Sequence, residues 1–170
     1  MKLHRPLLAV LFALVFVSGF TFSAEAQVAV YAGFSGAPVS GSGATGSAFG
    51  PMFGLYAQSG RYISLGGDVR GSFLTRNGFN YFTGAAGPRV SIKPPILPFR
   101  PYVEGLVGVA SLKDGNGSSS STKLNYQVLG GIDATILPHI DWRVIEFGYS
   151  AVSGNSVNAK IFSTGLVLRL

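Results

Sequence analysis

The stretch "KLNYQVLGGIDATI", residues 123–136, has the clearest periodicity in this 170-residue chain. Apolar side chains fall on its even positions and polar ones on its odd positions: Tyr126, Val128 and Ile132 against Asn125, Gln127 and Asp133. An alternation with a period of two puts the two sets on opposite faces of an extended strand. The stretch therefore predicts a β-strand with one apolar face and one polar face.

Similar runs follow one another along the chain after Gln27, separated by clusters of Gly, Ser, Asn or Pro. The eight predicted strands cover residues 28–36, 49–58, 62–74, 80–92, 99–112, 123–136, 141–152 and 159–170. Most are long enough for the roughly 9–11 tilted residues with which a β-strand crosses a bilayer. No segment after Gln27 has a helical period over ten residues or more.

The connections between these runs alternate in character. Residues 37–48 ("APVSGSGATGSA") and 113–122 ("KDGNGSSSST") are long, polar and rich in Gly and Ser, whereas "SGR" and "LPHI" are short. Outer-membrane barrels show this asymmetry, with long external loops and short periplasmic turns. We therefore expect residues 37–48 and 113–122 to be external loops.

Strands of this kind suit either a soluble barrel with an apolar interior or a membrane barrel with an apolar exterior. Charged residues make up only 12% of the chain, against roughly 25–35% for a water-facing surface. The mid-strand charges are of both signs, as expected of buried ions that need partners. We therefore predict an all-β fold, an eight-stranded antiparallel up-and-down transmembrane β-barrel with a polar lumen. Its predicted lumen charge network, for which a structural role is expected, consists of Asp68, Arg70, Arg89, Glu104, Asp133, Glu146 and Arg169.

Aromatic residues with a polar tip lie mostly toward the ends of the predicted strands. They are Tyr31, Tyr56, Tyr62, Tyr81, Tyr102, Tyr126, Trp142 and Tyr149. Membrane barrels place such residues in girdles at the two lipid interfaces. The pattern predicts that these residues face lipid.

Residues 1–26 are typical of a secretory signal peptide. Lys2 and Arg5 precede the apolar core at 7–17, and Ala24-Glu25-Ala26 forms an A-x-A cleavage site. The core is shorter than the roughly 20 residues of a membrane helix. We expect residues 1–26 to be removed and residues 27–170 to form the barrel, with 11 basic and 6 acidic residues and a net charge of +5.

Two segments resemble a known family. "HIDWRVIEFGYSAVSG" (139–154), followed by "AKIFSTGLVLRL" (159–170), is similar to the closing hairpin of small bacterial outer-membrane β-barrels. The type is the porin-family or outer membrane protein A-like transmembrane domain. "GPRVSI" (87–92) and "RPYVEGLVGVA" (100–110) resemble the fourth and fifth strands of such domains.

The resemblance implies a Gram-negative outer membrane as the location and lipid as a partner. It also implies that the assembly machinery reads the C-terminal strand, which usually ends in an aromatic residue and here ends in Leu170. Because the sequence stops at the eighth strand, the peptidoglycan-binding role of larger relatives is not expected.

No motif points to catalysis, a cofactor or a metal. The chain has no cysteine, so thiolate metal sites are excluded. His139 is the one histidine after cleavage, and "GSGATG" (41–46) precedes a predicted strand, not the helix of a dinucleotide site.

The basic residues are scattered along the chain, which favours anionic lipid or envelope polymer over nucleic acid as a partner. The same charges would equally well serve solubility alone. No small-molecule substrate is identified. We expect a non-enzymatic protein with an envelope-structural or surface-interaction role. Two alternatives stay open, a soluble exported barrel that binds a small apolar ligand and a narrow ion-conducting channel.

Overall fold

The computed structural model describes residues 26–41, 44–76, 79–114, 120–153 and 158–170. These residues form eight antiparallel strands and no helix. The predicted signal peptide lies outside the described residues except for Ala26. The described residues contain no helix that is long and apolar enough to cross a membrane.

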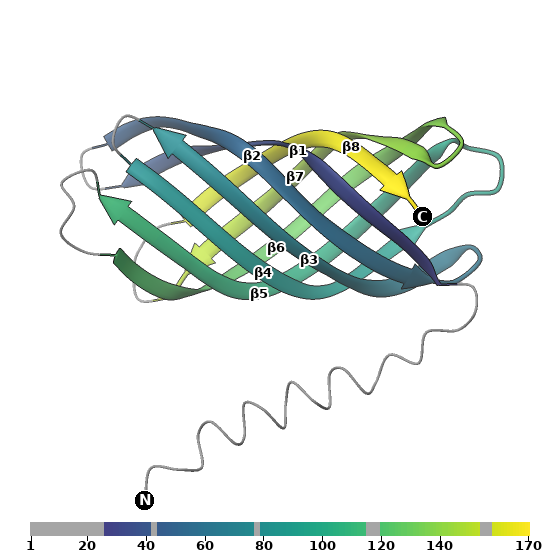
Figure 1. Cartoon of the computed structure of the whole chain (residues 1–170), viewed down its shortest axis with the longest axis horizontal. Helices are drawn as coiled ribbons and strands as arrows, with labels where there is room; N and C mark the ends of the chain where they lie inside the picture. Colours follow the sequence, from purple (N-terminus) through teal and green to yellow (C-terminus); the bar gives the residue numbers. More distant parts are fainter. Residues whose placement is uncertain (1–25, 42–43, 77–78, 115–119, 154–157) are drawn as a thin grey trace, which may run out of the picture.

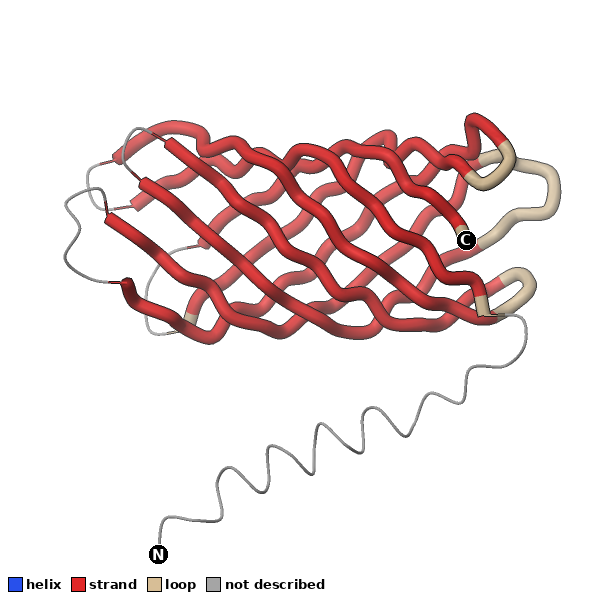
Figure 2. The backbone as a smooth tube through the Cα atoms, viewed as in Figure 1, coloured by secondary structure: helices blue, strands red, loops and turns tan. Residues whose placement is uncertain are grey.

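The strands form one closed barrel in which each strand pairs with its neighbours in the sequence (Figures 1 and 2). They are β1 Gln27–Gly41, β2 Ala44–Ser59, β3 Ile63–Arg76, β4 Phe79–Ile92, β5 Phe99–Asp114, β6 Ser120–Leu137, β7 Ile140–Val152 and β8 Asn158–Arg169. The barrel closes where β1 pairs antiparallel with β8 from Ala29↔Arg169 to Val39↔Ala159. Because closure leaves no sheet edge, every strand finds partners on both sides. The prediction of eight strands and an antiparallel barrel is confirmed.

Two of the predicted external loops are shorter than expected. The β1–β2 ladder continues to Gly41↔Ala44, so most of residues 37–48 belong to the sheet. Similarly, β5 extends to Asp114 and β6 begins at Ser120. Gly and Ser lower strand propensity, but in a hairpin the cross-strand ladder satisfies the backbone groups whatever the side chains are. The short turns lie at the end of the barrel where the chain terminates (Figure 2), and we call this the turn end.

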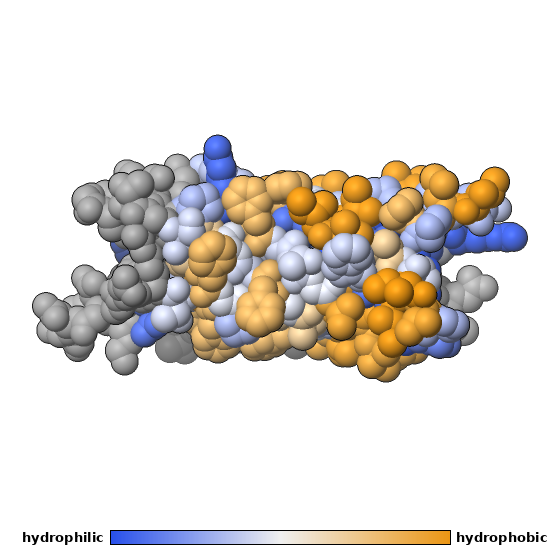
Figure 3. Space-filling model, turned by 90° about the horizontal axis from the view of Figure 1, so that it is seen from above, coloured by the Kyte–Doolittle hydropathy of each residue, from blue (hydrophilic) through white to orange (hydrophobic). Residues whose placement is uncertain are grey.

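Hydrophobic side chains cover much of the outer face seen in Figure 3, most densely toward the turn end, with paler patches between them. Val128 is 61% exposed, Val103 58% and Leu166 57%, although all three lie within strands. The residues that alternate with them point into the barrel and are buried, and these include charged side chains. Burial is thus inverted relative to a soluble barrel, in which apolar side chains fill the interior.

The prediction for the aromatic residues is wrong for half of the set. Tyr62, Tyr126, Trp142 and Tyr149 are exposed on the outside. Tyr31, Tyr56, Tyr81 and Tyr102 are instead buried inside the barrel, each at most 7% exposed. Three of their hydroxyl groups have polar partners inside, as buried tyrosines usually do: Tyr31 donates to Asp68, Tyr102 donates to Glu146, and Tyr81 accepts from Asn125.

Candidate functional site

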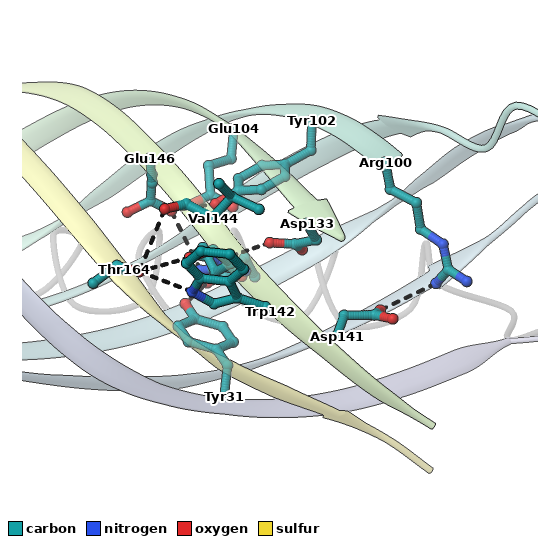
Figure 4. A network of polar contacts seen from close by, with 12 residues as sticks. Tyr31, Arg100, Tyr102, Glu104, Asp133, Asp141, Trp142, Val144, Glu146 and Thr164 are labelled. Atoms are coloured by element: carbon teal, nitrogen blue, oxygen red, sulfur yellow. Dashed lines mark hydrogen bonds and ion pairs between the residues drawn. The ribbon is translucent and has the colours of Figure 1, made fainter. Parts of the chain in front are cut away.

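A cluster of charged side chains fills the middle of the barrel (Figure 4). We call it the lumen ion cluster, and it consists of Asp68, Arg70, Arg89, Glu104, Asp133, Arg143 and Glu146. These residues come from the five consecutive strands β3 to β7, and none is more than 5% exposed. Ions taken out of water at this depth are tolerable only when they are paired and hydrogen-bonded.

Arg70 and Arg89 each bridge more than one carboxylate. The Arg70 Nη2 lies 2.6 Å from the Glu146 Oε2, and its Nη1 lies 3.5 Å from the Glu104 Oε1. Arg89 Nη1 lies 2.9 Å from the Glu104 Oε2, and its Nη2 lies 3.0 Å from the Asp133 Oδ2. Glu104 is therefore shared by two guanidinium groups on neighbouring strands, and the pairs join into one network.

Arg143 completes this network from the other side. Its Nε lies 3.0 Å from the Asp133 Oδ1, and its Nη1 lies 3.3 Å from the Glu146 Oε2. The Tyr102 hydroxyl donates to the same Glu146 oxygen at 2.6 Å. The Tyr102 ring also stacks against Arg89, whose guanidinium carbon is 3.6 Å from the ring centroid. Ion pairing, hydrogen bonding and cation–π contact thus hold the same few groups in place.

Six of the seven predicted lumen charges belong to the lumen ion cluster, and the seventh lies elsewhere. The exception is Arg169, whose Nε is 3.0 Å from the Asp141 Oδ2. Arg100 Nη1 lies 3.3 Å from the same oxygen, so Arg100, Asp141 and Arg169 form a separate mouth triad at the turn end (Figure 4 shows Arg100 and Asp141). Burial, together with the guanidinium groups of Arg100 and Arg169, lowers the pKa of Lys93, which follows β4 at this end.

Sequence reasoning did not identify Arg143, and a local irregularity explains why. Arg143 and Glu146 are three residues apart, so a regular strand would turn them to opposite faces. The β7–β8 register shifts between Arg143 and Glu146, and this bulge turns both side chains inward. Charge balance offered a clue, since the six correctly placed residues contain four carboxylates and only two guanidiniums.

Uncharged layers separate the lumen ion cluster from the end of the barrel opposite the turn end, which we call the loop end. Polar side chains come first; for example, Asn125 Nδ2 donates to the Ser150 Oγ at 2.8 Å. An apolar lumen layer follows, made of Ala37, Ala48, Leu74, Tyr81, Ala110, Val152 and Ala159. All seven are at most 8% exposed. The interior is therefore packed with side chains, as expected for eight strands.

The charged groups of the lumen ion cluster are buried as well as paired. The side chains of the ion-paired cluster residues are at most 3% exposed. Within the described residues no group of three or more His, Cys, Asp or Glu could hold a metal ion. His139 lies in the β6–β7 turn, between the strands that carry Asp133 and Arg143.

The Tyr102 hydroxyl group packs directly against Gly131, and replacing Gly131 tests the packing of the lumen ion cluster. A Cβ atom at Gly131 would lie 2.5 Å from the Tyr102 hydroxyl oxygen and 2.6 Å from its Cζ. Gly131→Ala is therefore expected to displace Tyr102 from Glu146 and to lower the free energy of unfolding by about 1–3 kcal/mol. Gly105→Ala is the matched control, because a Cβ there meets no atom within 4 Å. Urea titration of the folded barrel in detergent measures both, and equal stability of the two variants would contradict the expectation.

Solved structures similar to this chain are small outer-membrane β-barrels. Neisserial surface protein A matches with a TM-score of 0.64 at 17% identity, over 86% of this chain and 98% of that one. The attachment invasion locus protein Ail of Yersinia pestis matches with a TM-score of 0.58 at 15% identity, over 86% and 99%. The N-terminal β-barrel domain of Pseudomonas aeruginosa OprF matches with a TM-score of 0.54 at 10% identity, over 86% and 98%. Neither a family model nor a curated protein matches the sequence. At these identities the likeness establishes the fold.

Proposed function

We propose that this chain, which has the fold of small outer-membrane β-barrels, is a non-enzymatic protein of the outer membrane with an envelope-structural or surface-interaction role. The observation that carries the proposal is the inverted burial: Val128 is 61% exposed in mid-strand, whereas Glu146 is fully buried. In water the exposed apolar side chains would stay hydrated, which is costly. In a bilayer the same side chains face hydrocarbon, and the lumen charges are stabilised by pairing with one another.

The lumen ion cluster then has a structural role, and the barrel does not conduct ions. Its four carboxylates are paired with the guanidinium groups of Arg70, Arg89 and Arg143 at 2.6–3.7 Å. The apolar lumen layer adds a second barrier, since an ion passing it would lose its hydration without gaining a partner. Both features argue against the alternative of a narrow channel.

The alternative of a soluble barrel with a small apolar ligand is also disfavoured. Such a protein needs an apolar interior, whereas eight charged side chains are buried among the residues that the structure describes: the seven of the lumen ion cluster and Asp141. Its surface would have to be polar, whereas Phe34, Leu65 and Leu166 are each more than half exposed.

Lipid and the assembly machinery are the proposed partners. The outer row of β8, which includes Leu166 and Leu168, faces lipid, and β8 closes the barrel against β1. The assembly machinery would read this closing strand even though it leads to Leu170 and not to an aromatic residue. The structure of Ail has also been solved in complex with the heparin analogue sucrose octasulfate. For the surface-interaction role of this chain, a sulfated glycan is accordingly a first partner to test.

Cell fractionation with a heat-modifiability gel tests the proposed function. The expressed protein is expected in the outer-membrane fraction, and the unboiled sample is expected to migrate faster than the boiled one, because a closed barrel stays compact in detergent. Reconstituted in a planar bilayer, the same preparation is expected to show no discrete conductance steps. Recovery in the soluble periplasmic fraction would reject the membrane location, and stable unitary currents would reject the closed lumen.

A further inference from the structure

A groove of about 530 Å³ runs along the outer face of the barrel where β7, β8, β1 and β2 lie side by side. Its outward-facing lining is mainly apolar and includes Phe34, Gly36, Pro38, Phe49, Ile145 and Phe162. The ring of Phe49 lies over Gly36, where a Cβ would come within 2.7 Å of it. The absence of a side chain at Gly36 thus leaves room for the Phe49 ring to lie flat against β1.

Lys160 lies at the loop end of this groove. It belongs to the outward row of β8, two residues before Phe162 and so about 6.6 Å from it along the strand. Its neighbour Ala159 pairs with Val39, so Lys160 lies beside Pro38, which lines the groove at this end. Lys160 is exposed, and it is the one charged residue on the outer face among the strand side chains that the structure describes.

The position of Lys160 matches the headgroup level of a bilayer. It is the third residue of β8, counted from the loop end, and its cross-strand partner Tyr149 is 47% exposed. An exposed tyrosine at this height is typical of the interfacial girdle. A lysine costs little there, whereas it would cost several kcal/mol at the midplane. From Lys160 the groove extends past Phe162 to Thr164, toward the middle of the barrel.

We propose that this groove binds an acyl chain of a phosphorylated lipid in the leaflet on the loop side, and that Lys160 binds the phosphate of the same lipid. The proposal rests on the proposed membrane location. An apolar furrow that runs from headgroup level toward the midplane fits an acyl chain. A compact ammonium group beside its upper end favours a phosphate headgroup with a net negative charge over a zwitterionic headgroup, in which a choline or amine offsets the phosphate charge. The occupant is therefore an anionic phospholipid or glycolipid with a phosphate near its chains.

Trp142, the only tryptophan, provides a built-in reporter. Its Nε1 donates a hydrogen bond to the Thr164 Oγ1 at 3.2 Å, and Thr164 lines the groove (Figure 4). Bromine atoms in the middle of an acyl chain that occupies the groove would therefore quench the fluorescence of Trp142. Because Trp142 is itself exposed to the surrounding lipid, only the difference in quenching between the natural sequence and the Lys160 variants reports the occupancy of the groove.

The experiment uses the full barrel in phosphatidylcholine vesicles that contain equal mole fractions of either brominated phosphatidic acid or brominated phosphatidylcholine. The relative binding constant for phosphatidic acid over phosphatidylcholine is expected to be about five for the natural sequence. It is expected to fall to about one for Lys160→Gln and to be restored by Lys160→Arg. Arg61→Gln is the matched control, because Arg61 is exposed in the turn between β2 and β3 at the opposite end, and it is expected to keep the preference.

Equal quenching by the two lipids in the natural sequence would overturn the proposal, as would a preference that survives Lys160→Gln. If neither brominated lipid quenched Trp142, the barrel would not be in the bilayer at all. That result would reject the proposed membrane location and, with it, this site. A preference for phosphatidic acid that is lost only in Lys160→Gln supports both the membrane location and the lipid site.

Discussion

Glu146→Gln is expected to lower the free energy of unfolding by about 3–5 kcal/mol. Glu146 is fully buried and accepts hydrogen bonds from Arg70 at 2.6 Å, Arg143 at 3.3 Å and Tyr102 at 2.6 Å. The substitution keeps the size of the side chain but removes the charge that balances two guanidinium groups. Those groups stay buried, so their lost hydration is no longer compensated. The measurement is a urea titration of the barrel in phospholipid vesicles, followed by Trp142 fluorescence.

Arg100→Gln is the matched control within the mouth triad. The Arg100 side chain is 21% exposed, and Asp141 keeps Arg169 as a partner. A partly hydrated pair of this kind contributes little, so a loss of about 1 kcal/mol or less is expected. If Glu146→Gln were as stable as Arg100→Gln, the lumen ion cluster would not be the structural element described above.

Val128→Arg is expected to destabilise the barrel in a bilayer by about 2–4 kcal/mol, the cost of a guanidinium near the midplane of the lipid face. Val128 is 61% exposed in the middle part of β6 and pairs with Gly105 and Tyr149 across the ladder. A new side chain there has room, so the expected loss comes from the lipid environment and not from packing. Reversible unfolding from phospholipid vesicles measures it.

Ile96→Arg provides the comparison at the edge of the lipid face. Ile96 is 90% exposed in the turn between β4 and β5, where an arginine reaches the interface and is expected to cost about 0–1 kcal/mol. The depth dependence is the diagnostic result. Equal effects at positions 96 and 128 would mean that Val128 faces water, which would contradict the inverted burial.

The sequence was sufficient to predict the fold because most strands keep their alternation without interruption. In β6, Asn125 and Gln127 face inward and Tyr126 and Val128 face outward, as the period of two predicts. The number of strands and their order followed from the same pattern. Strand ends were less predictable, because at residues 37–48 the ladder joins two segments of the chain that are rich in Gly and Ser and have low strand propensity.

The candidate site was only partly predictable, for two physical reasons. At the β7 bulge the period of two breaks, so Arg143 and Glu146 face the same way although their positions differ in parity. Tyrosine is also ambiguous, since its ring suits a lipid interface and its hydroxyl suits a polar lumen. For Tyr102 the neighbouring charge decides between the two faces. Tyr102 is two residues from Glu104 on the same strand, so both side chains face the lumen.

The pairing of β1 with β8 joins the first residues of the barrel to the last, for example Ala29 to Arg169. Such a contact cannot form while the polypeptide is still being synthesised or exported, because its second half does not yet exist at the site of folding. Until then β1 has one unpaired side, and its Val28 and Val30 would be open to association with other chains. The β1–β8 pairing is therefore the last one to become possible, and closure of the barrel has to wait until residues 158–169 are available to β1.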